Sequence, residues 1–230
     1  MTYVEALNKS LSDLLTEDET VFLIGQGVQS PWYVGRACDG LLDRFGPKRI
    51  IDTPVSECAM MGAAVGAAIT GMKPIIVFPR MDFLLYAMDP IVNQASKHHY
   101  TFGGKAGPCP VTIWAVINRG GGQGTQHSSD YTWLFAGIPG LKVVSPNLPE
   151  QVYHLFKQAV NDPNPVMFVD NRARYDEELE APKLRANLED CIIRMPCTPK
   201  CPVPVSETLE SEYWYNQESQ GNVWLPNRCR

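Results

Sequence analysis

The sequence has no long hydrophobic run. A membrane-spanning helix needs roughly 18 consecutive apolar residues, and the nearest stretch, residues 59–69, is too short and too rich in glycine and alanine. The first ten residues, MTYVEALNKS, contain neither the basic region nor the apolar region of a secretory signal. We therefore expect no membrane association and a cytoplasmic location.

An excess of positive charge is also missing. The net charge of −5 gives no electrostatic basis for binding nucleic acid or an anionic membrane. Three common motifs are absent as well: the phosphate-binding GxxxxGK[ST], the hydrolase GxSxG and the zinc-binding HExxH. The glycine cluster at residues 120–124 does not match GxGxxG, and it favours a flexible loop.

Cysteine is present in an odd number, seven. Cys38, Cys58 and Cys109 are widely separated, and we expect all three to be buried as small hydrophobic side chains. The other four lie near the C-terminus, at positions 191, 197, 201 and 229. Their spacing fits neither a CxxC pair nor a zinc ribbon, so we expect no zinc site there.

Short apolar runs alternate with segments of helical periodicity. The runs at 21–24, 49–51, 74–78, 111–117, 141–144 and 166–169 predict strands. The segments at 2–15, 32–45, 57–71, 81–99, 131–135 and 149–161 predict helices, with a capping box at Thr2 and Glu5 and a kink or new helix at Pro90. This alternation predicts a three-layer α/β sandwich with a mostly parallel six-stranded sheet. We expect residues 1–182 to form this domain and 183–230 to form an irregular extension rich in proline and cysteine.

The segment from 50 to 71 combines an acidic residue with a glycine-rich helix. Ser56 is the expected N-cap, and Glu57 follows it directly. Small residues share one face of this helix, at positions 59, 62, 63, 66 and 67. Glycine costs roughly 1 kcal/mol in a helix relative to alanine, so we expect a buried helix that packs closely against another backbone. The alternative for Glu57 is that an acid simply favours a helix N-terminus.

Three polar or aromatic groups follow successive strands of the predicted sheet. Glu57 follows the second strand, Asp82 and Phe83 follow the third, and His127 follows the fourth. Ligands of parallel sheets bind at the carboxyl ends of the strands, so we expect these side chains to converge. The remaining histidines, at positions 98, 99 and 154, lie in predicted helices, where we expect structural roles.

Several short segments together resemble a known family. They are IDTPVSE at 51–57, DPIVNQASK at 89–97, QHS at 126–128, PGLKVVSP at 139–146 and DPNPV at 162–166. In this order and spacing they resemble the β chain of 2-oxoacid dehydrogenase E1 components of the pyruvate and acetoin types, over roughly residues 1–175. The fold that this resemblance implies is the pyrimidine-binding domain of thiamine diphosphate enzymes.

The resemblance implies roles for the residues at the strand ends. Glu57 would hydrogen-bond N1′ of the cofactor's aminopyrimidine, which favours the imino tautomer that takes the proton from thiazolium C2. Phe83 would pack against the pyrimidine, with Asp82 beside it, and His127 would face the substrate. The resemblance also suggests a structural potassium ion, held mainly by backbone carbonyls at Val111, Ala159, Val160, Asp162 and Asn164.

The chain also differs from the family pattern. Gln26 lies where the family usually has an acid, and no GDG motif for the diphosphate and Mg²⁺ occurs. The family's β chains normally continue into a further domain of over a hundred residues, where this sequence has only its unusual tail.

We therefore expect a β-type subunit that completes its site with an α-type E1 subunit, which would hold Mg²⁺. A heterotetramer and a lipoyl acyltransferase core are the partners that the family implies. The expected reaction is oxidative decarboxylation of a 2-oxo acid such as pyruvate. The alternatives are a transketolase-like or carboligase subunit of specialised metabolism, and a catalytically silent partner of the same fold.

Overall fold

A six-stranded sheet forms the centre of the molecule. The computed structural model describes residues 1–146, 151–178 and 187–193. The strands are β1 (Val21–Gly25), β2 (Ile50–Asp52), β3 (Lys73–Phe78), β4 (Thr112–Ile117), β5 (Lys142–Val144) and β6 (Val166–Asn171). Their order is β2-β1-β3-β4-β6-β5, and every neighbouring pair is parallel. The predicted α/β class and parallel sheet are therefore confirmed.

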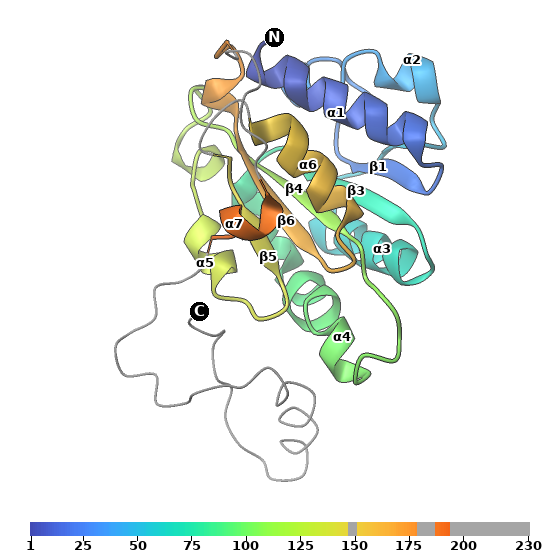
Figure 1. Cartoon of the computed structure of the whole chain (residues 1–230). Helices are drawn as coiled ribbons and strands as arrows, with labels where there is room; N and C mark the ends of the chain where they lie inside the picture. The colour runs from blue at the N-terminus through green and yellow to red at the C-terminus, as the bar shows by residue number, and fades with distance from the viewer. Residues whose placement is uncertain (147–150, 179–186, 194–230) are drawn as a thin grey trace.

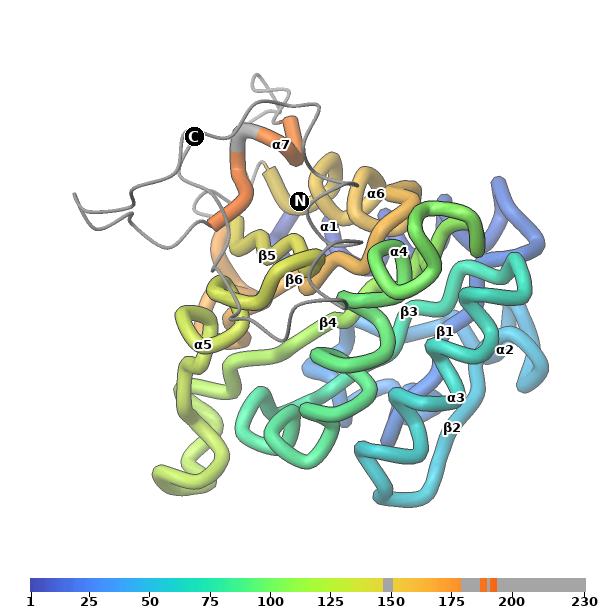
Figure 2. The backbone as a smooth tube through the Cα atoms, turned by 90° about the horizontal axis from the view of Figure 1, so that it is seen from below, coloured from blue at the N-terminus to red at the C-terminus, as the bar shows by residue number. Residues whose placement is uncertain are grey.

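Helices cover both faces of this sheet, which gives three layers (Figures 1 and 2). Helices α1 (Tyr3–Glu17) and α6 (Val152–Asn161) pack on one face, in a core that contains Leu23. Helix α3 (Glu57–Ile69) and the segments η1 (Met81–Ala87) and η2 (Pro90–Ala95) pack on the other, in a core that contains Ile24. Successive side chains of a strand point to opposite faces of the sheet. Because helices cover both faces here, the residues on both sides of strands such as β1 and β4 are buried, and the sequences of these strands are continuous apolar runs.

The N-terminal helix begins as the sequence predicts. The Thr2 hydroxyl accepts a hydrogen bond from the Glu5 amide, and the Glu5 carboxylate accepts one from the Thr2 amide. This reciprocal pair satisfies two amide groups that the first turn leaves without partners. Helix α1 has 15 residues, and within the described residues no helix combines the length and the apolar composition that a membrane span requires.

Short helical segments connect the main elements. They are α2 (Leu41–Phe45), α4 (His98–Thr101), η3 (Thr125–His127), α5 (Thr132–Ala136), η5 (Arg172–Arg174) and α7 (Leu188–Cys191). Helix α7 lies within the predicted extension, where Leu188 is buried and the Ile193 amide donates to the Val143 carbonyl. The first described residues after 182 thus pack on the sheet. The residues from 194 onward lie outside the described part, so the boundary at 182 stays a prediction.

Two predicted helices are shorter than expected. The segment 32–45 is helical only in α2, because Gly35, Arg36 and Gly40 have positive φ angles that interrupt a helix. The segment 81–99 consists of a 3₁₀ segment (η1), a π-helical segment (η2) and one turn of α4. A new segment does begin at Pro90, as predicted.

Helix α3 also differs from its prediction. Its buried stripe is a different set of residues, which packs in the core on this face of the sheet and combines two methionines and a valine with two alanines: Met60, Met61, Ala64, Val65 and Ala68. The small face is open, since a Cβ added at Gly62 or Gly66 would meet no atom within 4 Å. Within the described residues no other backbone packs along this face, so the expected close approach of a second backbone stays a prediction. Cys58 lies on the same side and is exposed, whereas Cys38 and Cys109 are buried as predicted. Ser56 is the N-cap residue, but its side chain makes no capping bond.

Candidate functional site

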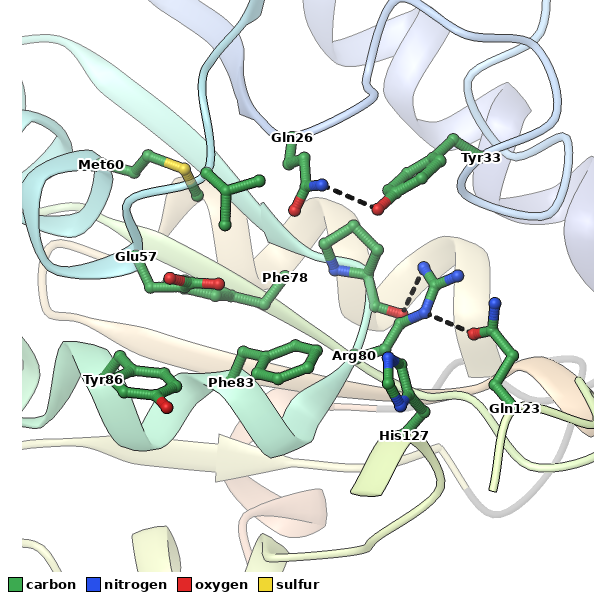
Figure 3. Close-up of a pocket in the computed structure, with 12 residues that line it drawn as sticks. Gln26, Tyr33, Glu57, Met60, Phe78, Arg80, Phe83, Tyr86, Gln123 and His127 are labelled. Carbon is green, nitrogen blue, oxygen red and sulfur yellow. Dashed lines mark hydrogen bonds between the residues drawn. The ribbon is translucent and has the colours of Figure 1, made fainter. Parts of the chain in front are cut away.

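A cavity lies at the carboxyl ends of four adjacent strands. Loops after β2, β1, β3 and β4 each contribute side chains to it, as expected for the edge of a parallel sheet where the strands end. The cavity has a volume of about 490 Å³, enough for a small-molecule ligand. Its lining consists of Gln26, Tyr33, Val55, Glu57, Met60, Phe78, Pro79, Arg80, Phe83, Tyr86, Gln123 and His127 (Figure 3).

Glu57, Phe83 and His127 all line this cavity, so the structure brings together the three groups predicted from the strand ends. Glu57 is the first residue of α3 and is half-buried, and it makes no hydrogen bond or ion pair to any described residue. The His127 ring contacts the Phe83 ring edge-on, with centroids 5.2 Å apart. The Nδ1 atom of His127 is buried and has no partner among the described residues. Both polar groups therefore retain capacity to bind a ligand.

Asp82 does not line the cavity. Both of its carboxylate oxygens accept from the Ser129 amide, at 3.3 Å each. Ser129 lies two residues after His127, so Asp82 ties the loop that carries the histidine to η1. The structure thus gives Asp82 a positioning contact, and its predicted contact with the cofactor stays a prediction.

Arg80 was not predicted as a site residue. It follows β3 and is only 9% exposed, and burial lowers the pKa of its guanidinium. Its Nε donates to the Gln123 Oε1 atom at 2.9 Å, and its guanidinium lies 4.9 Å from the centre of the Tyr33 ring. Gln123 Oε1 also accepts from Asn118 Nδ2, whose Oδ1 accepts from Arg172 Nη1. A chain of amide groups thus connects two arginines at one end of the cavity.

Gln26 belongs to the same end of the cavity. Its Nε2 donates to the Tyr33 hydroxyl at 2.8 Å, so the residue that replaces the expected acid holds an aromatic side chain in the wall. The neighbouring Gly27 amide donates to the Asp52 carboxylate at 2.6 Å, which connects the loops after β1 and β2.

Arg80 lies two residues after the third strand, so the rule that ligands bind at strand ends would have identified it from the sequence. Tyr33 gave no such signal, because it lies in a loop that periodicity assigns to a helix.

The residues predicted for potassium lie together at the C-terminal end of α6 and beside β4. The Ala159 carbonyl accepts from the Thr112 hydroxyl and from the Asp162 amide, and the Val111 carbonyl accepts from the Val166 amide. The Asp162 carboxylate forms an ion pair with Lys142 at 2.6 Å. A cation of the protein itself therefore already neutralises the only carboxylate of the predicted set. Potassium binding here stays a prediction.

No cluster of three or more histidine, cysteine, aspartate or glutamate side chains suited to a metal ion occurs in residues 1–146, 151–178 and 187–193. The cavity itself is better suited to an organic ligand. Phe83, Met60 and Val55 supply apolar surface, and Glu57 supplies a hydrogen-bond acceptor that no other described residue occupies. A planar heteroaromatic ring with a polar edge fits this combination. Figure 3 shows Glu57 and Arg80 on different sides of the cavity, with Phe83 between them.

Comparison with known proteins agrees with this geometry. Residues 1–177 match the family model described as "Transketolase, pyrimidine binding domain". The chain is 42% identical over 180 residues to "Pyruvate dehydrogenase E1 component subunit beta, mitochondrial" of Saccharomyces cerevisiae, covering 78% of this chain and 49% of the relative. It is 39% identical over 183 residues to "Pyruvate dehydrogenase E1 component subunit beta" of Rickettsia conorii, covering 80% of this chain and 56% of the relative.

A solved structure shows the same fold. "Split gene transketolase, inactive beta4 tetramer" superposes with a TM-score of 0.62 at 20% sequence identity, covering 81% of this chain and 56% of that one. At this level of identity the similarity shows the fold alone. The chain spans about half the length of the curated relatives that it matches.

Proposed function

The chain belongs to the transketolase pyrimidine-binding domain family, and from this premise we propose that it binds the pyrimidine end of thiamine diphosphate as a β-type E1 subunit. The reaction proposed is oxidative decarboxylation of a 2-oxo acid such as pyruvate, performed together with an α-type subunit. The support for the substrate class comes from the curated relatives, whose names identify them as pyruvate dehydrogenase E1 β subunits.

One observation carries the proposal. Glu57 and Phe83 line the same cavity, and Glu57 has no hydrogen-bond or ion-pair partner among the described residues. A carboxyl group that is partly removed from water loses hydration, and this loss is offset only when a ligand supplies a hydrogen bond. An aminopyrimidine offers a ring nitrogen for Glu57 and a flat face for Phe83. The residues present therefore fit this group.

Each residue of the site has a separate task in this proposal. Thiamine diphosphate supplies the carbanion chemistry when bound. Glu57 holds a proton at the aminopyrimidine edge, and Phe83 fixes the plane of the ring. His127 lies against Phe83, from where it presents a donor to the substrate, and Asp82 holds the His127 loop in place. Met60 and Phe78 exclude water from the apolar side of the cavity.

The partners follow from the absence of a GDG motif in the sequence. We propose that an α-type subunit supplies the diphosphate and Mg²⁺ site, in a heterotetramer that serves a lipoyl acyltransferase core. Potassium at the α6 site remains part of this proposal. A cytoplasmic location is also proposed, although the yeast relative is named mitochondrial.

A transketolase-like or carboligase activity is the second candidate. The observation that favours it is the polar end of the cavity, where Gln26, Tyr33 and Arg80 meet. Gln26 replaces the acid of the family pattern, so the cavity carries less negative charge there and offers more hydrogen-bond donors. A larger polar substrate would use these groups.

The test is an assay of CO₂ release from pyruvate and from longer 2-oxo acids. The full chain is co-expressed with a candidate α-type subunit, purified as a complex and supplied with thiamine diphosphate and Mg²⁺. We expect Glu57→Gln to lower the rate by about 100-fold or more, because general acid–base groups contribute about 10²–10⁴-fold.

Glu19→Gln is the matched control. Glu19 is exposed and precedes β1, at the end of the sheet away from the cavity, so this variant is expected to keep full activity. Full activity of Glu57→Gln would refute the role of Glu57. A complex that forms but releases no CO₂ from any 2-oxo acid would refute the proposed reaction and favour a silent partner.

A further inference from the structure

The guanidinium of Arg80 is a buried cation without a buried anion. The side chain is 9% exposed, and none of the ion pairs among the described residues includes it. Its protein hydrogen bonds go to neutral acceptors, the Gln123 side chain at 2.9 Å and the Pro79 carbonyl at 3.4 Å. Removing a charge from water is costly unless a partner of opposite charge replaces the hydration. Arg80 has no such partner among the residues that the structure describes.

A second cation, Arg172, lies near Arg80. Burial lowers the pKa of Arg80 most, Tyr33 raises it, and the charge of Arg172 lowers it by a smaller amount. Arg172 Nη1 donates to the side-chain Oδ1 atom of Asn118 at 3.1 Å, and none of the ion pairs among the described residues includes Arg172. Among the described residues that line the cavity, Glu57 is the one acid, and it forms no ion pair with Arg80. This end of the cavity therefore carries positive charge that its own side chains do not neutralise.

The orientation of Arg80 is fixed before any ligand arrives. Gln123 Oε1 accepts both the Arg80 Nε–H and an Asn118 amide N–H, each at 2.9 Å. The Tyr33 ring lies against the guanidinium, and Gln26 holds the Tyr33 hydroxyl. These contacts use one edge and one face of the guanidinium and leave other N–H groups without a partner among the described residues. A preorganised planar fork of this kind binds carboxylate or phosphate oxygens in pairs.

We propose that Arg80, oriented by Gln123 and Tyr33, binds the anionic group of the substrate, a carboxylate or a phosphate, at the end of the cavity remote from Glu57. In Figure 3 the Arg80 side chain points toward Gln123, to which its Nε donates, while Glu57 lies on the other side of Phe83. A substrate held by its anionic end at Arg80 reaches back toward His127 and the proposed pyrimidine position. This inference rests on the proposed function only in identifying the bound anion as substrate.

Anion binding is measured on the full chain without turnover, by ligand-observed NMR titration. The probes are pyruvate, its neutral ester methyl pyruvate, and inorganic phosphate. Losing a charge-assisted hydrogen-bonded pair weakens binding by about 10- to 100-fold. We therefore expect Arg80→Gln to raise the Kd of the preferred anion by that factor and to leave the Kd of methyl pyruvate unchanged.

The matched control is Arg119→Gln. Arg119 is exposed and follows the same strand, β4, that leads to Gln123, and its replacement is expected to leave every Kd unchanged. Tighter binding of pyruvate than of phosphate identifies a 2-oxo acid substrate, and the reverse identifies a phosphorylated one. The proposal is overturned if the wild-type chain binds both anions no more tightly than Arg80→Gln does.

Thermal unfolding separates binding from a structural role. Because Arg80 is an unpaired buried charge, Arg80→Gln is expected to keep or raise the Tm of the free chain. If it lowers the Tm, Gln123→Ala retains the arginine and removes only its orienting partner. Gln123→Ala is expected to raise the Kd of the preferred anion by about 2- to 10-fold, and an unchanged Kd would then contradict the proposal.

The outcomes also distinguish this inference from the proposed function. Arg80-dependent anion binding by a chain whose assembled complex releases no CO₂ supports the inference and refutes the proposed reaction. CO₂ release that continues at the wild-type KM and kcat in Arg80→Gln supports the reaction and refutes the inference.

Discussion

The buried carboxyl group of Asp170 gives the most quantitative prediction. Asp170 is fully buried at the carboxyl end of β6, where its Oδ2 atom accepts from Trp114 Nε1 and from the Tyr175 hydroxyl. Its Oδ1 atom has no partner among the described residues. Burial raises the pKa of Asp170 from 3.8 to about 6, and the hydrogen bonds from Tyr175, Trp114 and Tyr3 only partly oppose this effect.

The free energy of unfolding should therefore depend on pH through this group. The folded state holds the proton more tightly than the unfolded chain, so stability is lost as pH rises from about 4 to about 6 and is constant above. The difference between pKa values of 3.8 and about 6 corresponds to about 3 kcal/mol at 1.36 kcal/mol per pH unit. About 2 kcal/mol of this loss falls between pH ~4.5 and pH ~7.5.

Asp170→Asn removes the titration and keeps the shape of the side chain. We expect its free energy of unfolding, relative to wild type, to rise by about 2 kcal/mol between pH ~4.5 and pH ~7.5. Urea unfolding followed by tryptophan fluorescence at both pH values measures this difference. Asp39→Asn, at an exposed aspartate, is the control and should show no change in the difference. If the difference in free energy of unfolding between Asp170→Asn and wild type is the same at both pH values, Asp170 does not have a raised pKa in the folded chain.

Three further predictions concern separate contacts. Gly140 has φ of +81°, and a Cβ there would meet the Ser96 carbonyl oxygen at 2.0 Å, so Gly140→Ala should lower the free energy of unfolding by more than about 2 kcal/mol in urea. Gly46 has a similar φ, but a Cβ there would meet no atom within 4 Å, so Gly46→Ala should lower the free energy of unfolding by only about 1 kcal/mol. Equal losses in the two variants would contradict a steric clash at Gly140. Lys142→Met should lower the free energy of unfolding by about 2 kcal/mol, because it leaves the buried Asp162 carboxylate without its cation. Lys9→Met removes an exposed ion pair and should lower it by less than about 0.5 kcal/mol in the same assay. Asp82→Ala should lower CO₂ release by about 10-fold and change its pH profile by freeing the His127 loop, and Asp82→Asn should restore most of the rate; an unchanged rate in Asp82→Ala would exclude the positioning role.

The strands were predictable because their burial is visible in composition. Strands β3 and β4 are covered on both faces, so nearly every residue is apolar and the runs stand out from the alternation of a half-exposed strand. The strand-end rule then placed Glu57, Phe83 and His127 on one edge of the sheet without any knowledge of side-chain positions. The same rule applies to Arg80, but its proposed role depends on the structure, in which no described carboxylate forms an ion pair with it.

Other features depend on contacts that periodicity does not encode. The interruption of the 32–45 segment comes partly from Arg36, whose positive φ has no sequence mark of the kind that glycine provides. The small face of α3 was assigned a partner because small residues permit close packing, but they are equally compatible with an open face. The position of Asp82 depends on the Ser129 amide, a backbone contact 47 residues away in sequence.

We propose above that Glu57 activates the pyrimidine end of the cofactor in a site completed by a second subunit. The most direct measurement is the rate of proton exchange at the thiazolium C2 atom of thiamine diphosphate bound to the assembled complex, followed by NMR after rapid mixing with D₂O. We expect Glu57→Gln to slow this exchange by about 100-fold or more relative to wild type and to Glu19→Gln. Exchange at the wild-type rate in Glu57→Gln, with the cofactor bound, would contradict it.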